Sequence, residues 1–432
     1  MIIKDQPEIY VIDRIMGSYK TTNAKEQMKG YIQDEKKFIF VTPLITEIKS
    51  TLEDIGKRNI FTPILTFEFN GYYNLADYTD DENDDDENNI IFMFQNKDYT
   101  PKSLMEHFLL LLDKKVNIVV THSLFLSLKS YNSDLFKDYI LIVDEVLSVV
   151  NSFHVTTNDW KVIEKSKDLM EFDDSGLLID YDNKYDGVFF KSLFDFIKKN
   201  ELIFNQNNDL IAITPIQLFK PFNEVYILTY MFEHSLMAAY FKLHQFTYKL
   251  EHNKDFEIKK LALNKKLLNI YNLKKFNYPQ QKVYKFSKSS FKKMKFLELN
   301  LLKKNTTNIF RSTFKTHSNT NAYTTFKDYQ DKLSGKRYAT NFLPINIRAT
   351  NDYVNIKSIA YLANRYMSAS VKQFFAGYQI KINEDLWSLG ELIQLLWRGC
   401  IRKGEPMNVY IPSKRMRSLL IDWLNADFIE LT

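Results

Sequence analysis

The chain has 432 residues, of which 45% are apolar and 15% aromatic, and its net charge is +5 at pH 7. This length exceeds one ordinary core and the apolar content excludes a disordered chain, so we expect two lobes of roughly 150–250 residues. With 11 glycines, 10 prolines and the single cysteine Cys400, the composition argues against a Gly/Pro-rich β-sandwich, a disulfide framework and a cysteine-based zinc module.

The apolar stretches are too short to cross a membrane, and the first residues, MIIKDQPEIYVID, lack the apolar core of a secretion signal. A single cysteine also fits a reducing compartment. We therefore expect a soluble cytoplasmic protein with no membrane partner, in the host cytoplasm if a phage encodes it.

Short β-rich runs alternate with helical patterns over the first half of the chain, which is typical of a mostly parallel sheet with helices on both faces. Apolar runs such as VNIVVT and YILIVD suit strands that are buried on both faces. Helical periodicity covers 47–58 and 103–114. The expected strands are 8–13, 37–42, 61–67, 90–94, 116–121, 139–144 and 224–229.

The remaining residues predict an insertion, a connector and a second lobe. The first lobe covers 1–250 and includes a partly irregular insertion at about 151–220, and 251–280 form a basic helical connector. The second α/β lobe covers 281–432. Its expected strands are 281–286, 339–347 and 407–411, and its expected helices are 354–367, 386–398 and 413–425.

Charge is unevenly distributed along the sequence. The run DDENDDDEN at 80–88 contains no apolar residue, which is typical of a solvated surface loop. Residues 254–304 contain fifteen lysines and three acids, interleaved with phenylalanine and tyrosine. This second pattern suits nucleic-acid binding, and it equally suits a lysine-coated amphipathic surface.

A candidate phosphate-binding loop follows the first strand. In such a loop backbone N–H groups and a helix N-terminus hold the phosphates, a lysine (Lys20) reaches the β and γ oxygens, and a hydroxyl (Thr21) ligates Mg²⁺. Relative to the pattern G-x-x-x-x-G-K-[ST], Arg14 and Tyr19 replace the two glycines. The alternative is an ordinary strand-to-helix turn. The expected nucleotide contacts are Gly17, Ser18, Tyr19, Lys20, Thr21 and Thr22.

The apolar strand YILIVD ends in the adjacent acids Asp144 and Glu145. An aspartate at the carboxyl end of a buried parallel strand can hold Mg²⁺ through water, and the next glutamate can orient and deprotonate an attacking water. A strand that ends in a solvated acidic turn is the alternative. We expect Asp144 to serve the metal and Glu145 to act as the base.

A third candidate segment lies near the end of the chain. In QLLWRGCIR, Gln394, Arg398 and Arg402 fall at i, i+4 and i+8, so one helix would present all three on one face. Guanidinium groups aimed at a γ-phosphate from another lobe act as arginine fingers. An exposed basic helix face is the alternative interpretation.

The order of these segments resembles the superfamily-2 helicases, especially the DEAD/DEAH-box-like DNA replication helicases of phages and viruses. MGSYKTT at 16–22 resembles motif I, FIFVTPL at 38–44 motif Ia, and VDEVL at 143–147 the DEAD/DEAH box. VVTHSLF at 119–125 resembles the strand-plus-threonine segment after motif Ia. ILTYMF at 227–232 resembles motif III, NIRATND at 346–352 motif V, and residues 394–402 motif VI.

The resemblance implies an α/β fold of two RecA-like P-loop NTPase lobes, with parallel sheets flanked by helices, and ATP and Mg²⁺ as cofactors. It implies catalytic roles for Lys20, Asp144, Glu145, Gln394, Arg398 and Arg402. It also implies nucleic acid as the partner, DNA more than RNA, with other replication proteins. The nucleic-acid contacts would be Thr42, Pro43, Thr121, His122, Arg348, Thr350 and Asn351. No adenine-reading glutamine motif precedes the loop, and 283–287 is the candidate for motif IV.

We therefore expect an ATP-dependent helicase or translocase that acts in the replication of a phage-like genome. A double-strand DNA translocase of the packaging type is one alternative, although the C-terminal half lacks the clustered acids of a nuclease. The other alternative is a helicase-shaped DNA-binding scaffold whose loop is impaired by Tyr19.

Overall fold

The computed structural model describes residues 6–56, 59–63, 103–128, 133–166, 169–182, 187–271, 282–345 and 353–426. The chain divides into two compact units. Unit 1 comprises Met1–Glu8, Asn23–Asp144 and Pro215–Tyr226, and unit 2 comprises Ile9–Thr22, Glu145–Thr214 and Ile227–Thr432. No helix within these ranges is long and apolar enough to cross a bilayer. The expected strand 90–94, the acidic run 80–88 and most of the expected strand 61–67 lie outside the described residues.

The first sheet has six strands in the order β11-β1-β10-β4-β2-β3. The pairs β1–β11, β2–β4 and β2–β3 are parallel, and all six residues of β4 are buried, as its apolar sequence predicts. The expected strands at 8–13, 37–42, 139–144 and 224–229 are confirmed, while 116–121 is shorter. The bounds are β1 Glu8–Asp13, β2 Lys37–Thr42, β3 Ile118–Thr121, β4 Tyr139–Asp144, β10 Glu224–Thr229 and β11 Lys249–Glu251.

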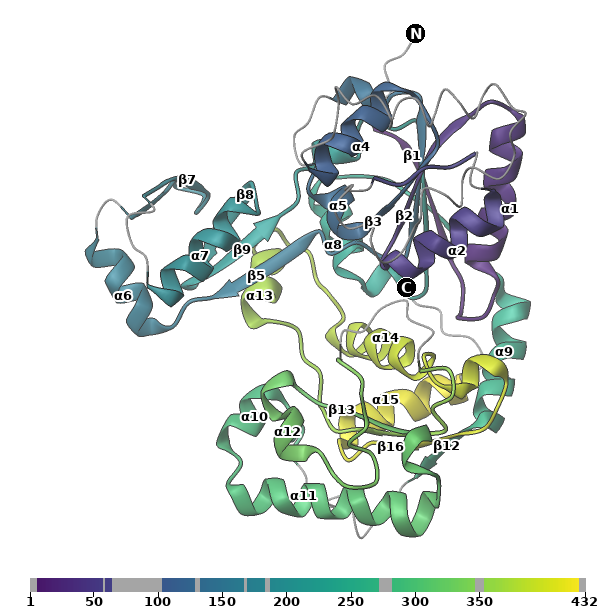
Figure 1. The fold of residues 1–432 in the computed structure, drawn as a ribbon. Helices are drawn as coiled ribbons and strands as arrows, with labels where there is room; N and C mark the ends of the chain where they lie inside the picture. Colours follow the sequence, from purple (N-terminus) through teal and green to yellow (C-terminus); the bar gives the residue numbers. More distant parts are fainter. Residues whose placement is uncertain are drawn as a thin grey trace. The chain divides into compact units, whose positions relative to one another are not determined.

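Helices cover both faces of the unit 1 strands, with α1 and α2 on one side and α4 and α5 on the other (Figure 1). The buried residues of α2 are spaced by about one turn, so a single stripe faces the sheet. Ser103 caps α4 by accepting a hydrogen bond from the Glu106 N–H at 3.1 Å. The bounds are α1 Lys20–Gln33, α2 Ile45–Ile55, α4 Leu104–Asp113 and α5 His122–Leu126.

The segment between β4 and β10, where we expected a partly irregular insertion, contains regular structure with its own core. Its strands form the antiparallel sheet β5-β9-β8 and the hairpin β6–β7, and Trp160, Leu193 and Leu210 lie in the core. The bounds are β5 Val150–His154, α6 Thr157–Lys165, β6 Met170–Phe172, β7 Leu178–Tyr181, α7 Val188–Lys198, β8 Leu202–Gln206 and β9 Asp209–Ile213.

Helix α13 (Ala369–Gly377) lies beside the insertion, against β8 and β9 (Figure 1). The Ser370 hydroxyl donates to Asp209 Oδ2 at 2.6 Å, and the rings of Phe374 and Phe204 are 5.3 Å apart. Polar and aromatic contacts therefore join this helix, which follows a strand of the second sheet, to the insertion.

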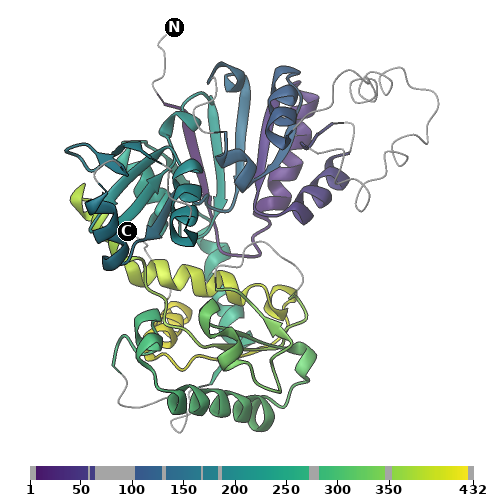
Figure 2. The ribbon, with the colours of Figure 1, turned by 60° about the vertical axis from the view of Figure 1, so that its left-hand side comes forward.

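The second sheet is parallel, with the order β12-β16-β15-β13-β14. Helices α10, α11 and α12 lie on one side and α14 and α15 on the other (Figures 1 and 2). The strands are β12 Leu268–Tyr271, β13 Asn321–Thr324, β14 Asn341–Phe342, β15 Ser358–Tyr361 and β16 Met407–Tyr410. The helices are α8 Leu236–Leu243, α9 Lys254–Leu267, α10 Lys288–Lys293, α11 Phe296–Asn308, α12 Gln330–Leu333, α14 Glu384–Leu396 and α15 Lys414–Asn425. Because β12 pairs with β16, this sheet begins before residue 281.

Two elements in this region differ from expectation. The helix expected at 354–367 is wrong, because the structure has the central strand β15 there. Ile359 and Tyr361 pack against α14 and α15, and Ala360 packs in the core on the opposite face of the sheet. The strand is therefore apolar at successive positions, and a short continuous apolar run cannot be distinguished from a buried helix by its periodicity. The strand expected at 281–286 is also wrong: residues 283–286 form a turn, and Ser287 then caps α10.

Candidate nucleotide site

Left-handed residues follow three adjacent strands of the first sheet. Tyr19 (φ 61°) follows β1, Glu145 (φ 67°) follows β4 and Met231 (φ 60°) follows β10. This conformation is costly for residues other than glycine and is concentrated at functional sites. Open α/β sheets bind ligands at the carboxyl ends of their strands, so these positions mark the candidate site.

The loop between β1 and α1 has the form of a phosphate cradle. Helix α1 begins at Lys20, so its N-terminal N–H groups point into the loop, and Gly17 has the left-handed φ of 76°. The Ser18 hydroxyl is buried and has no hydrogen-bond partner among the described residues. An orphaned hydroxyl beside a helix N-terminus fits a phosphate ligand, which would supply the missing acceptor. Lys20 Nζ donates to the Arg14 carbonyl at 2.6 Å and therefore lies within the loop. Thr21 is half-buried and Thr22 exposed in the first turn of α1.

Tyr19 adopts the backbone conformation of the glycine that it replaces. Its φ of 61° is one that glycine adopts freely, and its side chain is 68% exposed. The ring therefore points into solvent, and the loop backbone keeps the left-handed turn despite the substitution.

Replacing Tyr19 by glycine is expected to relieve the left-handed strain and to change the ATP dissociation constant by less than about threefold. Relief of this strain is worth about 1 kcal/mol of stability. Isothermal titration calorimetry and thermal unfolding measure both effects. A rise of tenfold or more in ATP affinity or turnover would instead mean that Tyr19 obstructs the loop.

Asp144 and Glu145 lie where β4 ends. Asp144 is buried, and its backbone carbonyl is hydrogen-bonded to His122 Nε2 at 2.8 Å. The Glu145 N–H donates to the Leu228 carbonyl at 2.9 Å, which holds the strained residue at the end of the neighbouring β10. Hydrogen bonds to His122 and to Leu228 therefore fix the backbone of the two acids.

The side chains of Arg398 and Glu145, which both belong to unit 2, contact each other. Arg398 Nη2 lies 3.8 Å from Glu145 Oε1, and the arginine side chain is 9% exposed. A buried guanidinium needs an anionic partner, and these two groups come from the segments that resemble motif VI and the DEAD/DEAH box. The site thus has a carboxylate and an arginine within contact distance.

The expectation that one helix carries Gln394, Arg398 and Arg402 is wrong. Helix α14 ends at Leu396, Arg398 lies in the following turn, and Arg402 is exposed in a separate 3₁₀ turn. Gln394 is half-buried in the last turn of α14. The chain leaves the helix here, because the Cys400 N–H donates to the Ile356 carbonyl at 2.9 Å, and a Cβ on Gly399 would lie 2.7 Å from Met407 Cε.

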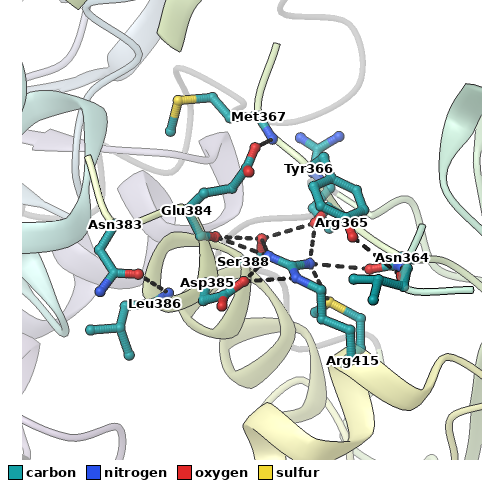
Figure 3. A network of polar contacts seen from close by, with 12 residues as sticks. Asn364, Arg365, Tyr366, Met367, Asn383, Glu384, Asp385, Leu386, Ser388 and Arg415 are labelled. Carbon is teal, nitrogen blue, oxygen red and sulfur yellow. Dashed lines mark hydrogen bonds and ion pairs between the residues drawn. The ribbon is translucent and has the colours of Figure 1, made fainter. Parts of the chain in front are cut away.

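A buried arginine holds the other end of α14 in place (Figure 3). Arg415, at the start of α15, donates to Asp385 Oδ1 at 2.7 Å, to the Arg365 carbonyl at 2.8 Å and to the Ser388 hydroxyl at 3.1 Å. It also lies over the Tyr366 ring. This part of the basic KRMR sequence is therefore structural, and it orients the helix that precedes Arg398.

A buried polar network next to the loop gave no recognisable signal in the sequence. Asp13 accepts hydrogen bonds from the Met231 N–H at 2.7 Å and the Phe232 N–H at 3.1 Å. Burial raises the pKa of Asp13, and these two N–H groups oppose the rise. Burial also raises the pKa of Glu257, whose carboxylate accepts from the Tyr230 hydroxyl at 2.6 Å. The Trp423 indole donates in turn to Tyr230 at 3.0 Å.

The expected nucleic-acid contacts of unit 1 are engaged in local hydrogen bonds. Thr42 is fully buried and donates to Glu47 at 2.6 Å, while Thr121 caps α5 and buried His122 contacts Asp144. Pro43 is half-buried. The segment with Arg348, Thr350 and Asn351 lies outside the described residues.

Comparison with known proteins places the chain among relatives of similar length. It is 30% identical over 438 residues to the SPbeta prophage-derived uncharacterized protein YonV of Bacillus subtilis (strain 168), which covers 96% of this chain and 98% of that protein. The chain belongs to the YonV family. Residues 262–424 of this YonV-family chain also match the YonV C-terminal Rossmann-like domain, a range that contains β12 to β16.

Solved structures give the fold class. The structure named XPD_Helicase aligns with a TM-score of 0.52 at 11% identity, over 97% of this chain and 95% of that one. The structure named XPD_APO aligns with a TM-score of 0.47 at 11% identity, over the same shares of the two chains. The match with a TM-score of 0.52, together with the Rossmann-like domain, confirms the expected α/β class of two RecA-like lobes with helix-flanked parallel sheets.

Proposed function

We propose that this YonV-family protein is an ATP-driven nucleic-acid helicase or translocase. The observation that carries the proposal is the contact of Arg398 with Glu145 at 3.8 Å, in the unit that also contains the Lys20 loop. A base at a strand end, an arginine from the Rossmann-like domain and a phosphate cradle are the parts that nucleoside triphosphate hydrolysis requires.

Each residue has a role that follows from its position. Lys20, the Ser18 hydroxyl and the α1 N-terminus would bind the phosphates of ATP, with Gly17, Tyr19 and Thr22 lining the loop. Glu145 would take a proton from the attacking water, and Arg398 would stabilise charge on the terminal phosphate. Gln394 and Arg402 would line the same region, with Arg402 exposed to solvent.

Mg²⁺ would neutralise phosphate charge when it is bound with ATP. Thr21 and buried Asp144, the latter through water, carry the oxygen ligands that this cation prefers.

We favour DNA over RNA as the partner because the relative in Bacillus subtilis is prophage-derived, and a prophage genome is DNA. Thr42, Pro43, Thr121, His122, Arg348, Thr350 and Asn351 are the candidate contacts, and contacts to the phosphate backbone would make binding salt-dependent. Replication of a phage-like genome, in the cytoplasm and together with other replication proteins, is the favoured setting. A packaging-type translocase and a scaffold without turnover are the alternatives.

Steady-state ATP hydrolysis tests the proposal. The full chain is assayed alone, with single-stranded DNA, with duplex DNA and with RNA, beside Lys20→Ala. We expect hydrolysis stimulated by nucleic acid, and a decrease of at least about a hundredfold in Lys20→Ala. Stronger stimulation by duplex than by single strands would favour the translocase, and ATP binding without turnover on any strand would favour the scaffold.

A further inference from the structure

Lys260 of helix α9 lies against the candidate phosphate loop. A Cβ built on Gly17 would stand 3.2 Å from Lys260 Nζ and 3.3 Å from Lys260 Cε. The ammonium group therefore lies directly against Gly17, and a side chain at this position would crowd it. Lys260 is half-buried, and none of the described carboxylates forms an ion pair with it.

Contacts on both sides of Lys260 hold α9 at the loop. Leu261 shares a hydrophobic core with Ile15, and His252, just before the helix, hydrogen-bonds through Nδ1 to the Asp13 carbonyl at 3.0 Å. Glu257, one turn earlier on α9, accepts from Tyr230 at 2.6 Å. Because these contacts lie on the buried stripe of α9, the adjacent Lys260 is directed toward the loop and not into solvent.

Charge in this region favours an anion beside Lys260. A cation without a carboxylate partner, placed against backbone in a left-handed turn, is the arrangement that binds phosphate oxygens. Lys20 in the same loop adds a second positive charge. The carboxylates of Asp13 and Glu257 interact electrostatically with Lys20, whereas Lys260 forms no ion pair with a described carboxylate.

We propose that Lys260 is a second phosphate-binding cation of the nucleotide site, and that it comes from the helix that leads into the Rossmann-like domain. Its ligand is the polyphosphate of a nucleoside triphosphate. The inference rests on the proposed function, which it deepens by giving the helix that leads into the Rossmann-like domain a direct contact with the phosphates, in addition to that of Arg398.

Binding of Mg-ATP and of inorganic triphosphate by the full chain, measured by isothermal titration calorimetry, tests the assignment. We expect Lys260→Ala to raise the dissociation constants of both ligands by about tenfold, because one charge-assisted hydrogen bond is lost. Lys260→Arg is expected to restore binding to within about threefold. The exposed neighbour on the same helix supplies the matched control, Lys259→Ala, which is expected to bind as the wild type.

The outcomes separate this inference from the proposed function. Wild-type affinity in Lys260→Ala, with an unchanged melting temperature, would overturn the role of Lys260 even if the protein hydrolyses ATP. Weak binding that Lys260→Arg does not restore would overturn it as well, because the lysine would then serve packing. If the wild type binds inorganic triphosphate through Lys260 but does not bind ATP, the ATP-driven function fails while the phosphate contact stands.

Discussion

Glu145→Gln is expected to abolish ATP turnover, with a loss of about 10²–10⁴-fold, while Mg-ATP binding stays within about threefold of the wild type. The amide keeps the shape of the side chain and loses the capacity to accept a proton from water. The backbone should not move, because the Glu145 N–H bond to Leu228 does not involve the side chain. Initial rates of phosphate release, together with a binding titration, separate the two effects.

The control for this variant is Glu164→Gln, an exposed position in helix α6 of the insertion. It makes the same chemical change outside the site and should leave turnover at the wild-type rate. If Glu145→Gln retained more than a tenth of the wild-type rate, another group would have to serve as the base.

Arg398→Ala is expected to lower kcat by about a thousandfold with a smaller effect on KM, because an arginine at the terminal phosphate acts mainly in the transition state. Arg398→Lys keeps the charge but loses the planar fork, so we expect it to recover only part of the rate. The 3.8 Å contact with Glu145 also predicts that the double variant with Glu145→Gln is no slower than the slower single variant. Single-turnover kinetics measure these values.

The matched control is Arg311→Ala, which removes an exposed arginine that donates to the Asn308 side chain. Thermal unfolding of each variant shows whether the fold is intact, since Arg398 is buried. A kcat within threefold of the wild type in well-folded Arg398→Ala would exclude the arginine-finger role and would leave Arg398 as a structural partner of Glu145.

The left-handed residues lie next to hydrogen bonds that reach helices α9 and α15. Glu145 and Met231 begin the turns after β4 and β10, and Asp13 at the end of β1 holds the Met231 turn through two backbone N–H groups. Tyr230, next to Met231, reaches Glu257 of α9 and Trp423 of α15. These hydrogen bonds therefore connect the residues beside the phosphate loop with helix α9, which leads into the Rossmann-like domain, and with helix α15 of that domain.

The local pattern of the sequence was sufficient for most strands of the first sheet, and it predicted a helix that begins at Lys20 after the loop. Strand β4 is apolar at every position before Asp144, and a strand buried on both faces needs this composition whatever lies around it. The Lys-Thr pair after a short loop likewise marks the first turn of a helix, because the helix N-terminus supplies N–H groups to an anion. These features depend on residues that are neighbours in the chain.

What the sequence by itself determined is thus the class of fold, most of the strands of the first sheet, and the positions of the loop, the paired acids and the arginine. Only the tertiary structure decided that 358–361 is a central strand, since a short apolar run is buried in either form until its partners β13 and β16 are in place. It alone decided that the chain leaves the helix after Leu396, because the Cys400 N–H pairs with the Ile356 carbonyl of a separate segment. For the same reason only the tertiary structure shows that Lys260 lies against Gly17 and that Arg398 contacts Glu145. The residues of each pair are far apart in the sequence, so their spacing along the chain does not predict the contact.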